Sequence, residues 1–358
     1  MPVVDLYGHS SLRDRLRSAV HRGTLPASLL IHGPRGIGKQ RLALWLGQLL
    51  LCEAGPAKAP CGVCRSCRYC AELGHPDLHW YFPRPRPKDA DPSLDEVKDD
   101  FIDAIRERAE TNGIYPPPSG LEGIFIRTVH LIVQQAGMTP TLSKRKVFVI
   151  GDADRMVAQE GSDQAANAFL KLLEEPLPDT TVVLTTSEPA SLLPTIRSRV
   201  IGLRANPLPD SDVRAFLKDP LATTALQSYR LPKDVEERVR LANGAPGALL
   251  DSSAAAEAHA LATQMLGAAR AGDAERFQLG LAFGSSKARG FFSDVLDALT
   301  AALHDRARER AQAGDDDGAR RAAMAVHVVE EAKFRASGNV NPQLIGSAIL
   351  REFAELRP

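Results

Sequence analysis

Short apolar runs recur along the first part of the chain, and segments with helical periodicity separate them. The runs are nearly all apolar and rich in β-branched or aromatic side chains, which is typical of parallel strands covered on both faces. Strands that alternate with helices in this way predict an α/β fold with a parallel, doubly wound sheet. The predicted strands are residues 29–31, 78–82, 147–150, 182–185 and 200–203.

Residues 83–120 interrupt this alternation. Prolines cluster at both ends of the segment, over 83–87 and 116–118, and an acid-rich helical pattern lies between them over 94–109. We expect a surface insertion that either contains one amphipathic helix or is partly disordered.

After Arg204 the pattern becomes helical. Pro207 and Pro209 introduce helices, and the Gly- and Pro-containing segment 243–247 interrupts them. From residue 251 onward the chain is rich in alanine and other helix formers. We therefore predict three domains, which are an α/β domain over 1–204, a small helical domain over 205–250 and a helical domain over 251–358.

A nearly complete phosphate-binding loop follows the first predicted strand. The pattern G-x-x-x-x-G-K-[ST] is met by Gly33, Gly38 and Lys39, and Gly36 is a further glycine within it. The glycines let backbone N–H groups surround phosphate oxygens, and the lysine reaches the β- and γ-phosphates. Gln40, however, stands where a Ser or Thr hydroxyl would ligate Mg²⁺. The loop predicts a nucleotide-binding fold, with a chance glycine-rich turn as the alternative, and leaves ATP hydrolysis in question.

All five cysteines of the chain lie within residues 52–70. In a reducing compartment such a cluster indicates metal binding more often than disulfides. Cys61, Cys64 and Cys67 form two overlapping C-x-x-C turns, so the fourth ligand of a tetrahedral zinc site is either Cys52 or Cys70. The alternatives are an iron–sulfur cluster on Cys61 to Cys70 and a reduced cluster that binds no metal.

Composition excludes some classes of protein. The chain has 358 residues, of which 44% are apolar and 25% charged, as in globular proteins. Lys plus Arg equals Asp plus Glu, at 44 each, and a net charge of zero argues against a chain that grips nucleic acid alone through a broad basic surface. No apolar stretch approaches the roughly 20 residues that cross a bilayer, and the N-terminus does not resemble a signal peptide. We therefore expect a cytoplasmic protein without a membrane partner.

Five motifs in order resemble bacterial clamp-loader subunits of DNA polymerase III, which belong to the AAA+ class. They are the phosphate-binding loop, the cysteine cluster after it and the segments 164–176, 196–199 and 339–342. The resemblance covers the α/β domain densely and the rest more loosely. It implies a subunit of a hetero-oligomer that loads the sliding clamp onto primed DNA. The implied partners are gamma/tau-like motor subunits and a delta-like clamp-opening subunit, which the domain over 251–358 contacts as a collar.

The resemblance also assigns roles to particular residues. It implies a structural zinc ion, because four thiolate ligands leave no open position for a water. It implies that Arg199 is offered to the nucleotide of a neighbouring motor subunit, where an arginine supplied in trans is worth about 10³ to 10⁵ in rate. A surface salt bridge is the alternative role for Arg199. The implied zinc ligands are Cys52, Cys61, Cys64 and Cys67.

Three positions depart from the motor subunits of this family, and all three concern Mg²⁺ or the γ-phosphate. Gln40 replaces the hydroxyl of the loop. Gly151 and Asp152 stand where active relatives carry an aspartate followed by a glutamate, and Gly247 lies near the position of an arginine that senses the γ-phosphate. The resemblance therefore implies a polymerase component without ATP hydrolysis of its own, in which passive ATP or ADP binding stays open. An ATP-hydrolysing motor subunit and, less favoured, an iron–sulfur redox protein are the alternatives.

Overall fold

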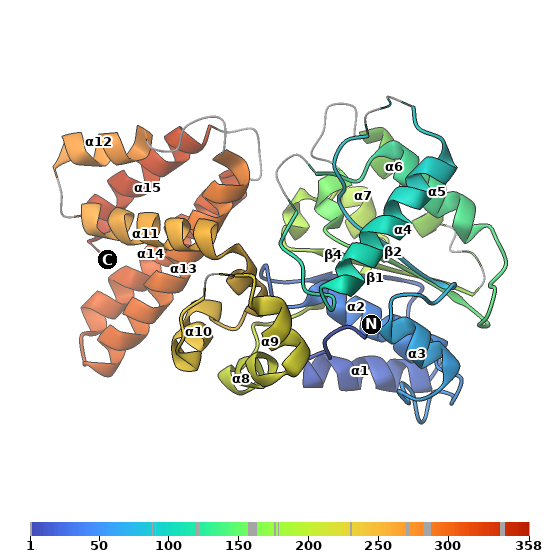
Figure 1. Ribbon diagram of the computed structural model, residues 1–358. Coiled ribbons are helices and arrows are strands. Elements are labelled where there is room, and N and C mark those ends of the chain that lie inside the picture. The colour runs from blue at the N-terminus through green and yellow to red at the C-terminus, as the bar shows by residue number, and fades with distance from the viewer. Residues whose placement is uncertain are drawn as a thin grey trace. The chain divides into compact units, whose positions relative to one another are not determined.

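A five-stranded sheet organises the first part of the chain in the computed structural model (Figure 1). The strand order is β2-β3-β4-β1-β5, and every neighbouring pair is parallel. All five predicted strands are confirmed, with ends that differ from the prediction by at most two residues. The strands are β1 (Ser28–His32), β2 (Leu78–Tyr81), β3 (Lys146–Ile150), β4 (Thr180–Thr186) and β5 (Ile201–Arg204).

The chain divides into two compact units, Met1–Leu250 and Asp251–Pro358. Side chains from 205–250, such as Leu208 and Val213, join the same hydrophobic core as the sheet. The predicted separation of 205–250 as a domain of its own stays a prediction. The structure describes residues 2–87, 89, 91–118, 122–156, 163–174, 177, 179–229, 231–269, 272–281, 288–336 and 341–357.

Helices cover both faces of the sheet, so the predicted doubly wound α/β fold is confirmed. Figure 1 shows α1, α2 and α3 on one face and α4, α5 and α6 on the other. The helices of this unit are α1 (Ser10–His21), α2 (Lys39–Leu51), α3 (Arg65–Ala71), α4 (Leu94–Glu110), α5 (Ile126–Ala136), α6 (Asp163–Glu174), α7 (Pro194–Arg197), α8 (Asp210–Lys218), α9 (Pro220–Leu226) and α10 (Val235–Ala242), with short 3₁₀ turns at Ala153–Met156, Pro189–Ser191 and Pro246–Asp251.

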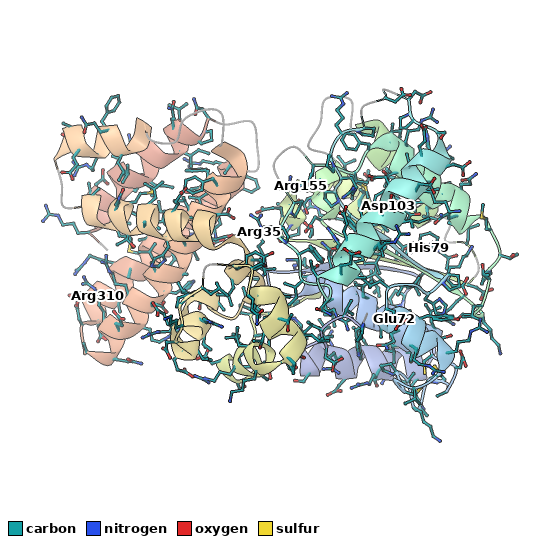
Figure 2. The ribbon with its side chains drawn as sticks, viewed as in Figure 1. Arg35, Glu72, His79, Asp103, Arg155 and Arg310 are labelled. Atoms are coloured by element: carbon teal, nitrogen blue, oxygen red, sulfur yellow. The ribbon has the colours of Figure 1, made fainter. Side chains whose placement is uncertain are left out.

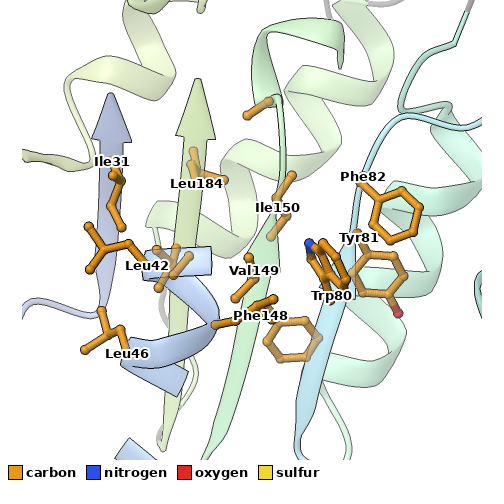
Figure 3. Close-up of a cluster of buried hydrophobic side chains, with 14 of the residues drawn as sticks. Ile31, Leu42, Leu46, Trp80, Tyr81, Phe82, Phe148, Val149, Ile150 and Leu184 are labelled. Atoms are coloured by element: carbon orange, nitrogen blue, oxygen red, sulfur yellow. The ribbon is translucent and has the colours of Figure 1, made fainter. Parts of the chain in front are cut away.

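The burial of the central strands explains why their apolar runs predicted strands correctly. Every residue of β3 and β4 is buried, because helices pack on both of their faces. On one face, α2 presents Leu42 and Leu46, which are one turn apart and share a side of the helix. These side chains lie against the sheet in the cluster of Figure 3, where Phe148 and Leu184 are also drawn. Continuous apolar runs are the consequence of this two-sided burial.

The insertion over 83–120 contains the predicted amphipathic helix, α4. Its start is fixed by a capping box in which the Ser93 hydroxyl accepts from the Glu96 N–H and the Glu96 carboxylate accepts from the Ser93 N–H, at 3.2 and 2.8 Å. Its apolar side reaches the core, because the ring centroid of Phe101 lies 4.9 Å from that of Tyr81 and 5.5 Å from that of Phe82. The insertion is therefore part of the folded unit.

The second unit is helical, as predicted, and the described residues after Arg204 form no strand. Apolar residues from all its longer helices, such as Leu299 and Val329, form a separate core. The Asn341 side chain caps the last helix by accepting from the Gln343 N–H at 2.9 Å, whereas residues 339 and 340 of the expected motif lie outside the described part. Among the described residues, no helix has the length and apolar character to cross a membrane. The helices are α11 (Ser252–Ala268), α12 (Asp273–Leu281), α13 (Ala288–Gln312), α14 (Asp316–Ala336) and α15 (Pro342–Leu356).

The stability of the first unit should depend on His79 of β2, which is labelled in Figure 2. Its ring stacks on Phe148 with centroids 4.6 Å apart, and burial lowers the pKa of the imidazole from 6.5 to about 4. The unfolded chain therefore takes up a proton near pH 6.5, whereas the folded chain does not until about pH 4. We expect His79 to lower the free energy of unfolding by on the order of 2 kcal/mol as the pH falls from 6.5 to 4, measured by urea unfolding.

The control for this prediction is His79→Phe, which keeps an aromatic ring beside Phe148 and cannot be protonated. Its loss of stability with acid should be smaller than that of the natural chain by about the same amount. Comparing the two proteins at each pH cancels contributions from other groups. Equal losses in both proteins would show that His79 is not responsible.

Candidate functional site

The predicted nucleotide site lies where the carboxyl ends of three neighbouring strands meet. The phosphate-binding loop follows β1, Gly151 follows β3 and Ser187 follows β4. Because these strands are parallel and adjacent, their carboxyl ends share one edge, the edge at which open α/β sheets bind ligands. The structure thus brings together the loop and the position that departs from the family pattern after β3.

Lys39 is turned onto the protein's own groups. Its side chain is buried, and its ammonium donates to the carbonyl oxygens of Gly33 and Pro34 at 3.0 and 2.7 Å and to the Ser187 hydroxyl at 2.8 Å. These contacts match the three N–H donors of an ammonium group. The charge that would meet the β- and γ-phosphates is therefore stabilised within the protein.

Gln40 fills the corner in which a hydroxyl, a carboxylate and Mg²⁺ would meet. Its Oε1 accepts from the Trp80 indole N–H at 3.0 Å and from the Tyr115 hydroxyl at 3.1 Å, and its Nε2 donates to an Asp152 carboxylate oxygen at 2.9 Å. A Cβ atom at Gly151 would lie only 2.3 Å from Gln40 Cδ. Gln40 could avoid it only by giving up these hydrogen bonds, so the departures at Gln40 and Gly151 form a single structural change.

Gly247 closes the loop from another side. Its N–H donates to the Gly36 carbonyl at 2.9 Å, and a Cβ atom at this position would lie 2.7 Å from Gly36 Cα. Any side chain at residue 247 would therefore displace the loop. On a further side, His9 Nε2 lies 2.8 Å from the Ile37 carbonyl oxygen. The position expected to sense the γ-phosphate is thus used to pack the loop.

The cysteine cluster has the geometry of a four-coordinate metal site. Its four sulfur atoms all lie within 4.8 Å of one another, and the Cys52–Cys64 and Cys61–Cys67 sulfur pairs are each 4.0 Å apart. A tetrahedron with Zn–S bonds of about 2.3 Å has edges of about 3.8 Å. The group contains Cys52 and not Cys70, which is buried in the hydrophobic core.

Backbone N–H groups and burial act in opposite directions on the thiols of the cluster. The Cys64 N–H points at the Cys61 sulfur at 3.4 Å, and this contact, with that of the Val63 N–H, lowers the pKa of the Cys61 thiol to about 6. Burial raises the pKa of Cys67, so a thiolate there needs a compensating positive charge. Burial also raises the pKa of Cys70 to about 12, which keeps that thiol protonated. The cysteines of the cluster therefore fit a dication such as Zn²⁺.

Arg199 lies at the surface between α7 and β5, and 32% of its side chain is exposed. The guanidinium forms an ion pair with Glu174 at the end of α6, with 2.6 Å between Nη2 and Oε1. The salt bridge expected as the alternative role of Arg199 is thus present, and it leaves the side chain accessible. Residues 175 and 176 of the α6 motif, and the side chains of 164–168, lie outside the described part of the structure.

Three residues of the nucleotide corner were absent from the sequence predictions, namely Trp80, Tyr115 and Ser187. Trp80 lies in a predicted strand, where its indole N–H was a donor in need of a partner. Ser187 follows a predicted strand at the carboxyl edge, which is a usable signal. Tyr115 lies beside three prolines in the insertion, and no local pattern connects it with the loop.

Known proteins share much of the sequence of the first unit. The family model described as "DNA polymerase III, delta subunit" matches residues 8–209. The DNA polymerase III subunit delta' of Pseudomonas aeruginosa is 33% identical over 180 residues, which are 50% of this chain and 43% of that protein. The same subunit of Bacillus subtilis is 31% identical over 193 residues, 54% of this chain and 46% of that protein. The subunit gamma/tau of Mycobacterium bovis is 29% identical over 213 residues, 60% of this chain and 30% of that protein.

The chain spans less than half the length of these three relatives. The region that the family model matches contains the loop, the cysteine cluster and the strands that position them. The family model covers more than half of this chain. The resemblance to clamp-loader subunits is thereby confirmed, and the chain belongs to the DNA polymerase III delta-prime family of clamp-loader subunits.

Proposed function

We propose that the chain is a delta-prime subunit of a cytoplasmic DNA polymerase III clamp loader, which helps to load the sliding clamp onto primed DNA and does not itself hydrolyse ATP. The observation that supports this proposal best is the hydrogen-bonded Gln40 side chain in the corner where Mg²⁺ would be held. Membership of the family supports the role in a clamp loader. The Gln40 side chain in this corner supports the absence of ATP hydrolysis.

Phosphoryl transfer depends on a metal ion that bridges the β- and γ-phosphates and on positive charge that meets them. In this chain Gln40 supplies no hydroxyl, and the Asp152 carboxylate accepts from the Gln40 amide. Lys39 would have to leave the Gly33 and Pro34 carbonyls before it could reach a phosphate. A nucleotide in this site would be a passive ligand, without the groups that catalyse its hydrolysis.

The remaining roles are shared with the assembly. Arg199 is exposed enough to be offered to the nucleotide of a gamma/tau-like motor subunit next to it. The unit Asp251–Pro358 is proposed as the collar that contacts the motor and delta-like subunits. The sliding clamp and primed DNA are then met through the assembly, in keeping with the zero net charge of this chain.

We further propose that zinc binds Cys52, Cys61, Cys64 and Cys67 as a structural ion. The segment between α2 and α3 contributes few side chains to the core, with Ala59 as a buried exception. Structural zinc contributes about 10 to 16 kcal/mol of apparent binding free energy in small modules, which is enough to order such a segment. Four thiolates leave no position for a reactive water.

The isolated chain should show no ATP turnover above background, with or without primed DNA, and Lys39→Ala should leave this result unchanged. The reason is that the groups for Mg²⁺ are missing, so the lysine has no catalytic partner. A coupled ATPase assay measures it. Turnover that disappears in Lys39→Ala would instead identify a motor subunit, the alternative that similarity to gamma/tau subunits favours.

Zinc content should be about one ion per natural chain, should fall in Cys52→Ser and should be unchanged in Cys70→Ser, which serves as the matched control. Serine is a poor zinc ligand, and Cys70 is outside the cluster. Metal analysis of the purified variants gives the answer. The assignment is wrong if Cys70→Ser loses zinc while Cys52→Ser keeps it, and iron absorption would favour an iron–sulfur cluster.

Arg199→Ala in this chain should lower the steady-state ATP turnover of a loader reconstituted with its motor and clamp-opening subunits. The adjacent motor site would lose a transition-state contact worth about 10³ to 10⁵ in rate. The ATP turnover of the loader should therefore fall by the whole contribution of that one site. Gel filtration should show an intact assembly. Unchanged turnover in an intact assembly rules out the role in trans.

A further inference from the structure

Two segments of the chain meet at the Arg199 side chain, namely the end of α6 and the segment 195–199. Glu174 is the last residue of α6, Thr195 lies within α7, and Ser198 follows α7 directly before Arg199. Each of these three residues contacts the Arg199 guanidinium. The side chain is thus held by groups from both its own segment and a helix 25 residues away in sequence.

The contacts orient the guanidinium and leave part of it available. Nη1 donates to the Thr195 carbonyl at 2.9 Å and to the Ser198 hydroxyl at 3.1 Å, and Nη2 donates to Glu174 at 2.6 Å. A guanidinium has five N–H donors. Within the described residues, the Nε–H and one N–H of Nη2 stay available for an incoming phosphate.

Glu174 is placed against the preference of its helix. A carboxylate in the last turn of a helix faces the negative end of the helix dipole, which disfavours it. The Arg199 guanidinium supplies the compensating charge at charge-assisted hydrogen-bond distance. The pair also restricts a side chain that otherwise loses about 2 kcal/mol of rotamer entropy when it is fixed.

A second arginine–glutamate pair in the same unit shows a different arrangement. Arg214 donates from Nε and Nη2 to the two oxygens of Glu236, at 2.7 and 2.8 Å, so one carboxylate occupies a whole edge of that guanidinium. Arg199 is instead held through Nη1 and Nη2, and no described residue accepts a hydrogen bond from its Nε–H. The Arg199 arrangement therefore suits a side chain that must be held and still bind another group.

We infer that Glu174 is a positioning residue, which holds the Arg199 guanidinium in the orientation in which it meets the phosphates of a neighbouring subunit's nucleotide. This inference rests on the proposed function of Arg199 in trans. Glu174 does not touch the nucleotide in this role. It acts by fixing the guanidinium beforehand, so that less conformational entropy is lost when the transition state forms.

The test is a double-mutant cycle in the reconstituted loader, with Glu174→Gln, Arg199→Ala and both changes together in this chain. Glu174→Gln should lower the ATP turnover of the adjacent site about two- to fivefold, the range of coupling in partly exposed ion pairs. The KM for ATP should not change, because the positions of the motor's own groups are unaltered. In the Arg199→Ala background the second change should have no further effect.

Glu236→Gln is the matched control, because it breaks an ion pair of the same residue types and comparable exposure elsewhere in the unit. It should leave turnover unchanged, and Glu174→Asp should recover part of the loss. Unchanged or increased turnover in Glu174→Gln, while Arg199→Ala lowers it, overturns the positioning role and leaves the proposed function standing. If Arg199→Ala itself has no effect, both fail.

Discussion

The hydrogen bonds of the Gln40 carboxamide hold together the corner of the predicted nucleotide site that is formed by Gln40, Trp80, Tyr115 and Asp152. The carboxamide joins the start of α2 to β2 through Trp80, to the end of β3 through Asp152 and to the insertion through Tyr115. One neutral side chain links these segments, because both ends of an amide can form hydrogen bonds at once. The insertion over 83–120, which the sequence predicted only as a surface element, is consequently tied to the site through Tyr115.

Helix α2 also connects this corner with the cysteine cluster. Gly38 and Lys39 stand at the amino end of α2, and Cys52 immediately follows its carboxyl end. Gln48 within the helix also donates to the Cys67 carbonyl at 3.1 Å. A helix of this length spans roughly 20 Å, and its apolar side is buried in the sheet. The loop and the cysteines are therefore fixed relative to one another by one rigid element.

The features that could be predicted from the sequence are those whose physical cause lies within a short contiguous segment. Strands covered on both faces produce continuous apolar runs, so 147–150 and 182–185 were legible, and the loop and the C-x-x-C turns are contiguous motifs. The partners of Gln40 come from residues 80, 115 and 152, which only the tertiary fold brings together. The same holds for the contact between Gly247 and Gly36. It also holds for Glu174, which lies in a contiguous motif but contacts Arg199, 25 residues further along the chain. The departures of Gln40, Gly151 and Gly247 from the family pattern could be seen in the sequence. The steric contact between Gly151 and Gln40 could not.

The close approach of Gly151 to Gln40 restricts the single substitutions that are tolerated at these two positions. Restoring an acidic residue at 151 while Gln40 is present places a side chain 2.3 Å from the amide carbon. Restoring a hydroxyl at 40 first leaves the Trp80 and Tyr115 donors without their acceptor, which costs about 1 to 3 kcal/mol for each buried group. Either single change therefore lowers stability. The two positions are coupled, and a substitution at one of them requires a compensating substitution at the other.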